Sequence, residues 1–372
     1  MGFSAFGGPI AHLGYFRDEF VTRRRWLSDE QFGEMIALAQ ATPGPASSKV
    51  GMQIGFEHGG LAGAFVAWFC FTMPSAAVMT AFAYGVGRVD PNAAWVHGLL
   101  LAAVAVVASA ILGMVRTLAP DPLRLTFAVL IAAVLIVVPA TGLSQLIAIV
   151  LGGVLGRYLV PKSNEPQESG DRKKLPLGSI LALVAFFALL GLSFVLPGAS
   201  VLGEFTRFYA GGALVFGGGH VVLPLLQERF VVPGLISQTN FLAGYAVAQV
   251  IPGPLFTFSA FLGALVPPVR GIAGAALALV AIFLPSALLL AGIVPIWRRI
   301  RGNETFRQAL AGVNAAVVGI LGAAFYSPIL TSAVHDRVDA AIALAGFAML
   351  YGIRLPPVIV VAGCAILRMS AA

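Results

Sequence analysis

The sequence has little charge and few residues that bind metals or do covalent chemistry. Only 10% of its 372 residues are Asp, Glu, Lys or Arg, whereas a soluble domain has about a quarter. The two cysteines, Cys70 and Cys364, lie in apolar runs without the spacing of a disulfide framework or a metal site. The five histidines are scattered, and no HExxH motif or other nucleophile–base pair occurs. We therefore expect a membrane rather than a soluble protein, with no enzyme activity, no cofactor and no metal site.

The features of nucleic-acid binding and of a cleavable signal peptide are also missing. The net charge is +7, but the basic residues stand at the ends of apolar runs, as is typical of cytoplasmic anchors of membrane spans. A nucleic-acid interface would need a basic face with interleaved aromatic residues. The first residues, MGFSAFGGP, show no charged region followed by an apolar one. We expect no nucleic-acid partner and no cleaved leader.

Apolar sequence dominates the chain. Hydrophobic residues make up 59% of it, and the mean hydropathy is +0.92. Several windows have no charged residue and can each hold one or two membrane crossings, since a crossing helix needs about 20 apolar residues. These windows include 59–87, 91–115, 125–156, 175–203, 230–269, 271–297 and 308–334. The sequence predicts an all-α, multi-pass membrane protein that has the lipid bilayer as a partner.

One sequence pattern occurs twice. Five short stretches of the first half recur in the same order about 210 residues later, with offsets that agree to within two residues. The most specific pair is AQATPGP (39–45) and AQVIPGP (248–254), which low complexity does not explain. The other pairs are FGGP (6–9) with FGGG (216–219), RDEFV (17–21) with QERFV (227–231), GLAGA (60–64) with GIAGA (271–275), and MPSA (73–76) with LPSA (284–287). The chain is thus predicted to contain two homologous helical repeats, an arrangement typical of secondary transporters.

A polar stretch separates the two copies. PKSNEPQESGDRKKLP is rich in charge and proline, which is typical of a mobile connection outside the membrane. Only five residues precede Phe6, so we expect a shortened leading helix in the first copy. The predicted organisation is a membrane repeat over 1–160, the polar linker over 161–176, an extra transmembrane helix over 177–197 and a second repeat over 198–372.

A Pro-Gly-Pro break interrupts the apolar sequence of each copy. Proline removes a backbone donor, and such a break is tolerated in a membrane only where it is buried in protein or lines a wet cavity. A helix that restarts after the break offers free N–H groups and a positive dipole end to an anion, and Lys49 adds a positive charge there. The predicted substrate pathway comprises Gln40, Pro43, Gly44, Pro45, Ser47, Ser48 and Lys49, and in the second copy Gln249, Pro252, Gly253, Pro254 and Thr257.

Structural roles stay open for the same residues. The breaks can be kinks packed against neighbouring helices, and Lys49 can extend to the membrane surface or pair with Glu57. Gln40 and Gln249 can satisfy the interrupted backbone.

The glycine motifs before the breaks are further candidates. Gly7 and Gly8, and in the second copy Gly217 and Gly218, are expected to end a helix, allow close backbone approach and expose N–H groups to an anion. Charged and titratable groups stand beside both motifs. We assign a gate or proton-coupling role to His12, Arg17, Glu19, His220 and Glu228. A solvated turn is the alternative interpretation of Arg17 and Glu19.

The stretches FGGPIAHLGYFRDEFVTRRRWLSDEQF and ALAQATPGPASSKVGMQIG resemble the chromate ion transporter family. FGGGHVVLPLLQERFV and AQVIPGPLFTFSAFLG resemble the C-terminal half of that family. The resemblance covers nearly the whole chain. It implies a carrier of two halves with opposite orientation in the bacterial plasma (inner) membrane, which exports chromate at the expense of the proton gradient. Sulfate, a tetrahedral dianion of like size, is the implied competitor.

Other functions and arrangements remain open. Transport of another oxyanion or of a small organic anion is one alternative, and a non-transporting membrane sensor or scaffold is another; a homodimer is also open. Residues 29–58 can form a re-entrant pair of half-helices or cross the membrane once. Neither of these arrangements gives a number of membrane crossings that places every arginine cluster on the cytoplasmic side, so the opposite orientation of the halves rests on the resemblance.

Overall fold

The described part of the chain is helical throughout, which confirms the predicted all-α membrane fold. The computed structural model describes residues 1–5, 8–86, 93–138, 142–159, 176–196, 200–215, 222–297 and 303–371. Four predicted site residues and most of the linker lie outside them: Gly7, Gly217, Gly218, His220 and 160–175. Within the described ranges, five helices are long and apolar enough to cross a membrane: 46–86, 94–118, 177–195, 271–296 and 304–333.

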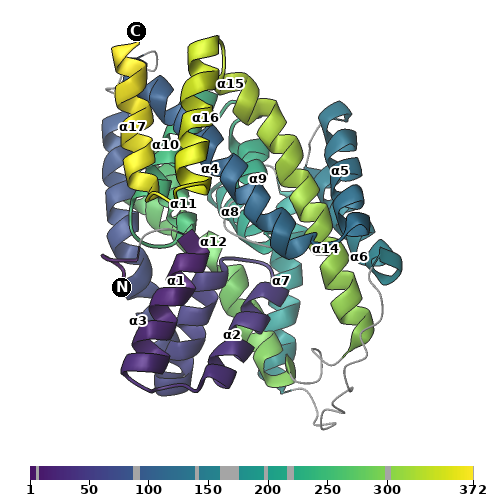
Figure 1. Cartoon of the computed structure of the whole chain (residues 1–372). Helices are drawn as coiled ribbons and strands as arrows, with labels where there is room; N and C mark the ends of the chain where they lie inside the picture. Colours follow the sequence, from purple (N-terminus) through teal and green to yellow (C-terminus); the bar gives the residue numbers. More distant parts are fainter. Residues whose placement is uncertain are drawn as a thin grey trace.

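The helices follow one another in two similar series (Figure 1). The first series is α1 (Gly8–Phe16), the π-helix η1 (Arg17–Arg23), α2 (Asp29–Ala41), α3 (Ala46–Val86), α4 (Ala94–Leu118), α5 (Pro122–Val137) and α6 (Gly142–Leu159). α7 (Leu177–Val195) lies where the extra helix is predicted. The second series is α8 (Val201–Ala213), α9 (Val222–Phe230), α10 (Gln238–Val250), η3 (Leu255–Thr257), α11 (Phe258–Leu265), α12 (Gly271–Ile293), η4 (Val294–Ile296), α14 (Glu304–Ala324), η5 (Phe325–Leu330), α15 (Thr331–Ala333), α16 (Arg337–Tyr351) and α17 (Pro357–Ser370).

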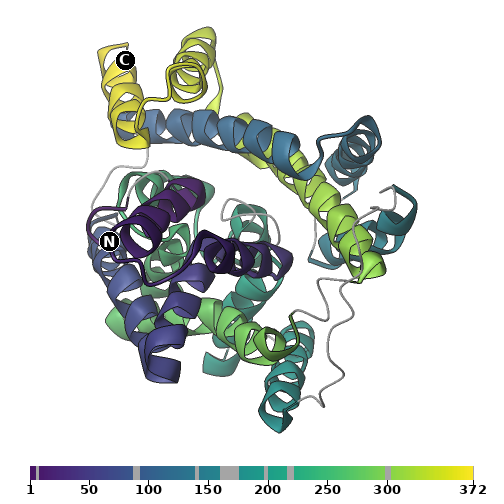
Figure 2. The same cartoon turned by 60° about the horizontal axis from the view of Figure 1, so that its bottom comes forward.

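Each series divides between two layers. Figure 2 shows α4, α14, α16 and α17 along one edge, apart from the cluster that contains α1–α3. The contacts agree: α4 packs on α16 and α17, and α14 packs on α5 and α6, whereas α12 packs on α3, α8 and α11. We call the layer of α1–α3 and α8–α12 the break layer, and that of α4–α6 and α14–α17 the cover layer. The two layers meet where α10 packs on α4 and α17.

A close contact of two helices follows each break. In α3 the helical conformation is interrupted at Gly59 and Gly60, and a Cβ on Gly55 would lie 2.3 Å from the Gly63 carbonyl oxygen. Residues 46–58 and 61–86 therefore pack closely against each other. α11 and α12 repeat this contact, since a Cβ on Gly263 would lie 2.3 Å from the Gly274 carbonyl oxygen. Only glycine permits such close approach of two backbones.

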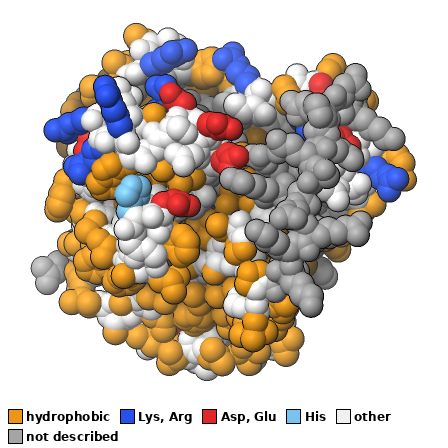
Figure 3. All heavy atoms as spheres, turned by 90° about the horizontal axis from the view of Figure 1, so that it is seen from below, with side chains coloured by type: hydrophobic (Ala, Val, Ile, Leu, Met, Phe, Trp, Pro, Cys, Tyr) orange, Lys and Arg blue, Asp and Glu red, His pale blue; other side chains and the backbone are white. Residues whose placement is uncertain are grey.

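The outer surface suits a lipid environment. Leu61, Val137, Val195 and Ile272 are each more than 70% exposed, which would be costly in water but not in hydrocarbon. Seen from below in Figure 3, charged side chains lie mainly in the upper half of the view, and hydrophobic side chains cover most of the lower half. The exposed ion pair of Arg17 in η1 with Asp29 in α2 suits water rather than hydrocarbon.

Candidate functional site: the two Pro-Gly-Pro breaks

The first break joins two short antiparallel helices, α2 and the start of α3, which we call the first hairpin; α10 and α11 form the second hairpin. Ser28 starts α2 with a capping box, in which its side chain accepts from the Gln31 N–H and Gln31 accepts from the Ser28 N–H. α2 ends before Pro43, Gly44 takes a φ of +109°, and α3 restarts at Ala46 with Ser47 and Ser48 in its first turn, as expected. Gln53 donates from Nε2 to the Met35 carbonyl oxygen across the pair at 3.2 Å. Residues 29–58 thus form two short helices that lie side by side.

Lys49 holds this pair together from inside. Its side chain is fully buried, and Nζ donates to the Ala39 carbonyl oxygen at 2.5 Å, to the Thr42 hydroxyl at 2.8 Å and to the Thr42 and Pro43 carbonyl oxygens. The last carbonyls of a helix have no intrahelical partner and carry partial negative charge, so a cation suits them. We expected the ammonium beside the free N–H groups of α3 or paired with Glu57; the structure places it at the carboxyl end of α2.

The second break has the same backbone and an apolar interior. Gly253 takes a φ of +110°, one degree from that of Gly44. η3 and α11 restart the helix after Pro254, and α10 and α11 lie so close that a Cβ on Gly244 would meet the Phe261 ring at 2.4 Å. Phe258, which aligns with Lys49, packs edge-on against Phe241 with ring centroids 5.1 Å apart. Aromatic packing thus replaces the buried ammonium.

Each break bonds to the start of the other copy. The Gly44 N–H donates to the Val215 carbonyl oxygen at 2.6 Å, and the Gly253 N–H donates to the Ala5 carbonyl oxygen at 2.9 Å. Val215 precedes FGGG and Ala5 precedes FGGP, so the two bonds occupy matching places in the repeat. Two reciprocal contacts of this kind are what a pseudo-twofold relation between the copies produces.

Each break glycine also lies against a serine of the other copy, and the two serines come from the matching MPSA and LPSA stretches. A Cβ on Gly44 would lie 2.1 Å from the Ser286 hydroxyl oxygen, and a Cβ on Gly253 would lie 2.6 Å from the Ser75 hydroxyl oxygen. We had used these matches only to recognise the repeat. A serine directly after a proline inside an apolar span, repeated in both copies, was the sequence signal that could have assigned Ser75 and Ser286 to the site.

Several hydroxyls beside the breaks are buried without a hydrogen-bond partner. Within the described ranges this is true of the Oγ atoms of Ser48, Ser259 and Ser286. Others are occupied: Ser75 donates to the Thr72 carbonyl oxygen at 3.0 Å, and Thr257 donates to the Pro254 carbonyl oxygen at 2.8 Å. Buried polar groups normally have partners, so the three open hydroxyls can serve a polar ligand.

His12 links the two breaks. It is buried, with Nε2 3.1 Å from the Ala5 carbonyl oxygen and Nδ1 3.3 Å from the Ser47 hydroxyl oxygen. The same Ala5 oxygen accepts from Gly253 in the second break. A chain of three hydrogen bonds, through His12 and the Ala5 carbonyl oxygen, therefore connects the first turn of α3 to the second break.

The other predicted residues lie around this centre. Gly8 begins α1, so the first glycine motif opens a helix where we expected it to end one. Gln40 is exposed, and Gln249 is half-buried and bonds to Tyr245.

The charged candidates lie farther toward the surface. Glu19 accepts from Arg24 at 2.6 Å and from Arg23 at 3.1 Å, and these bonds lower the pKa of its carboxyl. Such a group stays ionised near neutral pH and suits a gate contact better than a proton carrier. In α9, Glu228 approaches Arg229 at 4.0 Å. The gate roles of Arg17, Glu19 and Glu228 stay predictions.

Comparison with known proteins gives one consistent result. The family model described as Chromate transporter matches residues 1–157 and 202–369. A probable chromate transport protein of Synechococcus elongatus is 28% identical over 331 residues, which cover 87% of this chain and 81% of the relative. A chromate transport protein of Pseudomonas aeruginosa is 27% identical over 94% of this chain and 84% of its own length, and one of Cupriavidus metallidurans is 27% identical over 100% and 90%. No solved structure matches.

Proposed function

The chain belongs to the chromate transporter family, and we propose that it exports chromate across the bacterial inner membrane at the expense of the proton gradient, with sulfate as a competitor. The observation that carries the proposal is the reciprocal bonding of the breaks, in which Gly44 meets Val215 and Gly253 meets Ala5. It brings two helix starts into one region of a multi-pass membrane protein.

Chromate is a tetrahedral dianion, and the break region offers it donors without offering it carboxylates. The starts of α3 and of η3, which leads into α11, each carry a partial positive charge from the helix dipole. Together these charges offset part of the dianion's charge. The unpartnered hydroxyls of Ser48, Ser259 and Ser286 add neutral donors. Neither break segment contains Asp or Glu. Sulfate has the same charge and shape, so it would use the same donors.

We assign proton coupling to His12. A carbonyl oxygen only accepts, so neutral His12 donates from Nε2 to Ala5 and accepts at Nδ1 from the Ser47 hydroxyl. When His12 gains a proton, Nδ1 becomes a donor to Ser47. The Ser47 O–H is then released and can donate to an anion at the start of α3. Proton and anion binding would therefore favour each other, and the two would move together.

This sign of coupling decides which part of the proton gradient drives export. A dianion that leaves with one proton carries one net negative charge outward. An inside-negative potential favours that movement by about 2.3 kcal/mol per 100 mV, whereas the outward proton works against the pH difference by about 1.4 kcal/mol per unit. The membrane potential is thus the proposed driving component.

The test is uptake of labelled chromate into inside-out membrane vesicles, with sulfate, molybdate and phosphate as competitors. We expect uptake that sulfate inhibits most, that falls when the potential is collapsed, and that rises when the pH difference alone is collapsed. His12→Gln should flatten the pH dependence of the apparent affinity for chromate. Stronger inhibition by molybdate would assign another oxyanion as the preferred substrate. Absence of anion flux from reconstituted protein would instead support a sensor or scaffold.

A further inference from the structure

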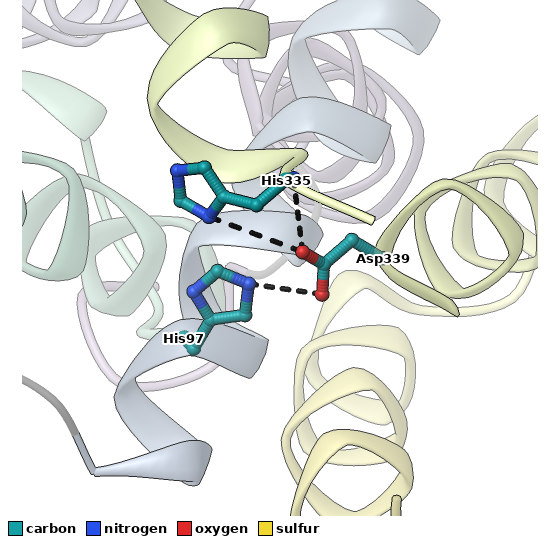
Figure 4. Close-up of side chains that lie close together, drawn as sticks. All are labelled: His97, His335 and Asp339. Carbon is teal, nitrogen blue, oxygen red and sulfur yellow. Dashed lines mark hydrogen bonds and ion pairs between the residues drawn. The ribbon is translucent and has the colours of Figure 1, made fainter. Parts of the chain in front are cut away.

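A cluster of two histidines and an aspartate lies in the cover layer, away from the residues that form the breaks. His97 is in the first turn of α4, His335 precedes α16, and Asp339 is in the first turn of α16 (Figure 4). One ligand atom from each of the three side chains lies within 4.8 Å of the other two. The histidines come from different copies and show no metal-binding spacing along the sequence, so we expected no such site.

The geometry points to a shared ligand. His97 Nε2 and Asp339 Oδ1 lie 2.9 Å apart, yet neither atom completes a hydrogen bond of good geometry. The Asp339 side chain is fully buried. Its other oxygen accepts from the His335 N–H at 3.0 Å, which holds the carboxylate in place, and the His335 ring stacks on the His97 ring with centroids 5.3 Å apart.

We propose that His97, His335 and Asp339 bind one divalent transition-metal ion, with Zn²⁺ as the best match. Two imidazoles and one carboxylate suit Zn²⁺ and leave a fourth position for water. Zinc–ligand bonds of 2.0–2.2 Å place tetrahedral ligand atoms about 3.3 Å apart. The closest pair, His97 Nε2 and Asp339 Oδ1 at 2.9 Å, has to separate by a few tenths of an ångström to admit the ion. His335 Nδ1, at 4.0 Å from Asp339 Oδ2, has to move inward, and its side chain is 60% exposed and free to turn.

Arg368 is the competitor for this site. Its Nε lies 3.1 Å from Asp339 Oδ1, so it neutralises the carboxylate that the metal would use. The same guanidinium also reaches Asp336 at 3.4 Å, which gives it a second carboxylate to hold when a metal takes Asp339. A bound ion would join the start of α4 from the first copy to the start of α16 from the second.

The experiment uses the full chain in detergent, with any affinity tag removed and metals stripped by a chelator. Zn²⁺ titration by calorimetry should give one ion per chain, and Co²⁺ should show the intense visible absorption of a tetrahedral site. His97→Ala and His335→Ala should each weaken Zn²⁺ binding at least tenfold. His58→Ala is the matched control, because His58 stacks on Trp26 at 4.5 Å in the break layer and should leave binding unchanged.

The Zn²⁺ affinity of the variant Arg368→Gln distinguishes a metal site from a network of ion pairs that binds no metal. Removal of the competing cation should raise Zn²⁺ affinity. The proposal is overturned if the wild-type chain binds no Zn²⁺, if the three histidine variants bind it equally, or if Arg368→Gln lowers the affinity of a folded chain.

Discussion

The first and second breaks share a backbone and differ in what fills them. Gly44 and Gly253 have φ angles of +109° and +110° and bond to matching residues of the opposite copy. Inside the first hairpin a buried lysine satisfies the carbonyl end of α2, whereas inside the second Phe258 packs on Phe241. The two copies thus keep the same glycine conformation and the same bonds to each other, whereas the side chains inside the two hairpins differ. Recognition of charge is thus expected from the first break and shape from the second.

The largest loss of transport is expected from substitution of Gly44 and Gly253, the glycines at the centre of the two breaks. Gly44→Ala forces a side chain into a left-handed conformation, which costs of order 1–3 kcal/mol, and its Cβ would meet the Ser286 hydroxyl at 2.1 Å. We expect chromate flux in vesicles to fall about a hundredfold, equivalent to about 2.7 kcal/mol. Gly253→Ala should fall nearly as far, since its contact with Ser75 is 2.6 Å.

Gly33→Ala is the control for both, because a Cβ at Gly33 in α2 meets nothing within 4 Å. It should transport normally at matched membrane expression. If Gly44→Ala and Gly253→Ala also transport normally, the shared conformation of these glycines has no part in transport.

The Pro-Gly-Pro segments were enough to predict the two breaks, because prolines within apolar sequence interrupt a helix. The pairing of Gly44 with Val215 and of Gly253 with Ala5 could not be predicted in this way, since it depends on how the two copies pack. The same limit applies to Lys49. Its flexible chain can reach either the N–H groups of α3 or the carbonyls of α2, and only the packing of the hairpin decides which. Likewise, His97 and Asp339 meet only through the contact of α4 with α16.

The second prediction tests the inequality of the two hairpins. Lys49→Gln keeps a polar chain but removes the charge and leaves carbonyls at the end of α2 without a strong donor. We expect the apparent affinity for chromate to fall about tenfold, or about 1.4 kcal/mol, and the melting temperature of the substrate-free protein to fall as well. Phe258→Leu, at the aligned position, should lower the melting temperature but change affinity little. A loss of affinity with unchanged melting temperature would instead make Lys49 a direct ligand.

The third prediction compares the serines beside Gly44 and Gly253. Ser286 has an open hydroxyl, whereas Ser75 donates to Thr72. Ser286→Ala should therefore weaken chromate binding about fivefold, the equivalent of about 1 kcal/mol, without loss of stability. Ser75→Ala should leave affinity unchanged and cost a little stability. Equal effects of the two variants on affinity would contradict an asymmetric site.

The smallest effect is expected from Thr257→Val in the second break. Thr257 aligns with Ser48, but its hydroxyl already donates to the Pro254 carbonyl oxygen at 2.8 Å, whereas the Ser48 hydroxyl has no partner among the described residues. Valine keeps the shape and removes a neutral hydrogen bond worth about 1 kcal/mol net, and most of that loss falls on folding because the bond lies within the protein. The apparent chromate affinity of Thr257→Val should therefore stay within about threefold of wild type, while Ser48→Ala should weaken it more.

Both variants are measured in the same vesicles as Lys49→Gln, at matched expression. If Thr257→Val abolishes binding and Lys49→Gln leaves it intact, the charge of the anion is recognised at the second break, and the roles given to the two hairpins have to be exchanged.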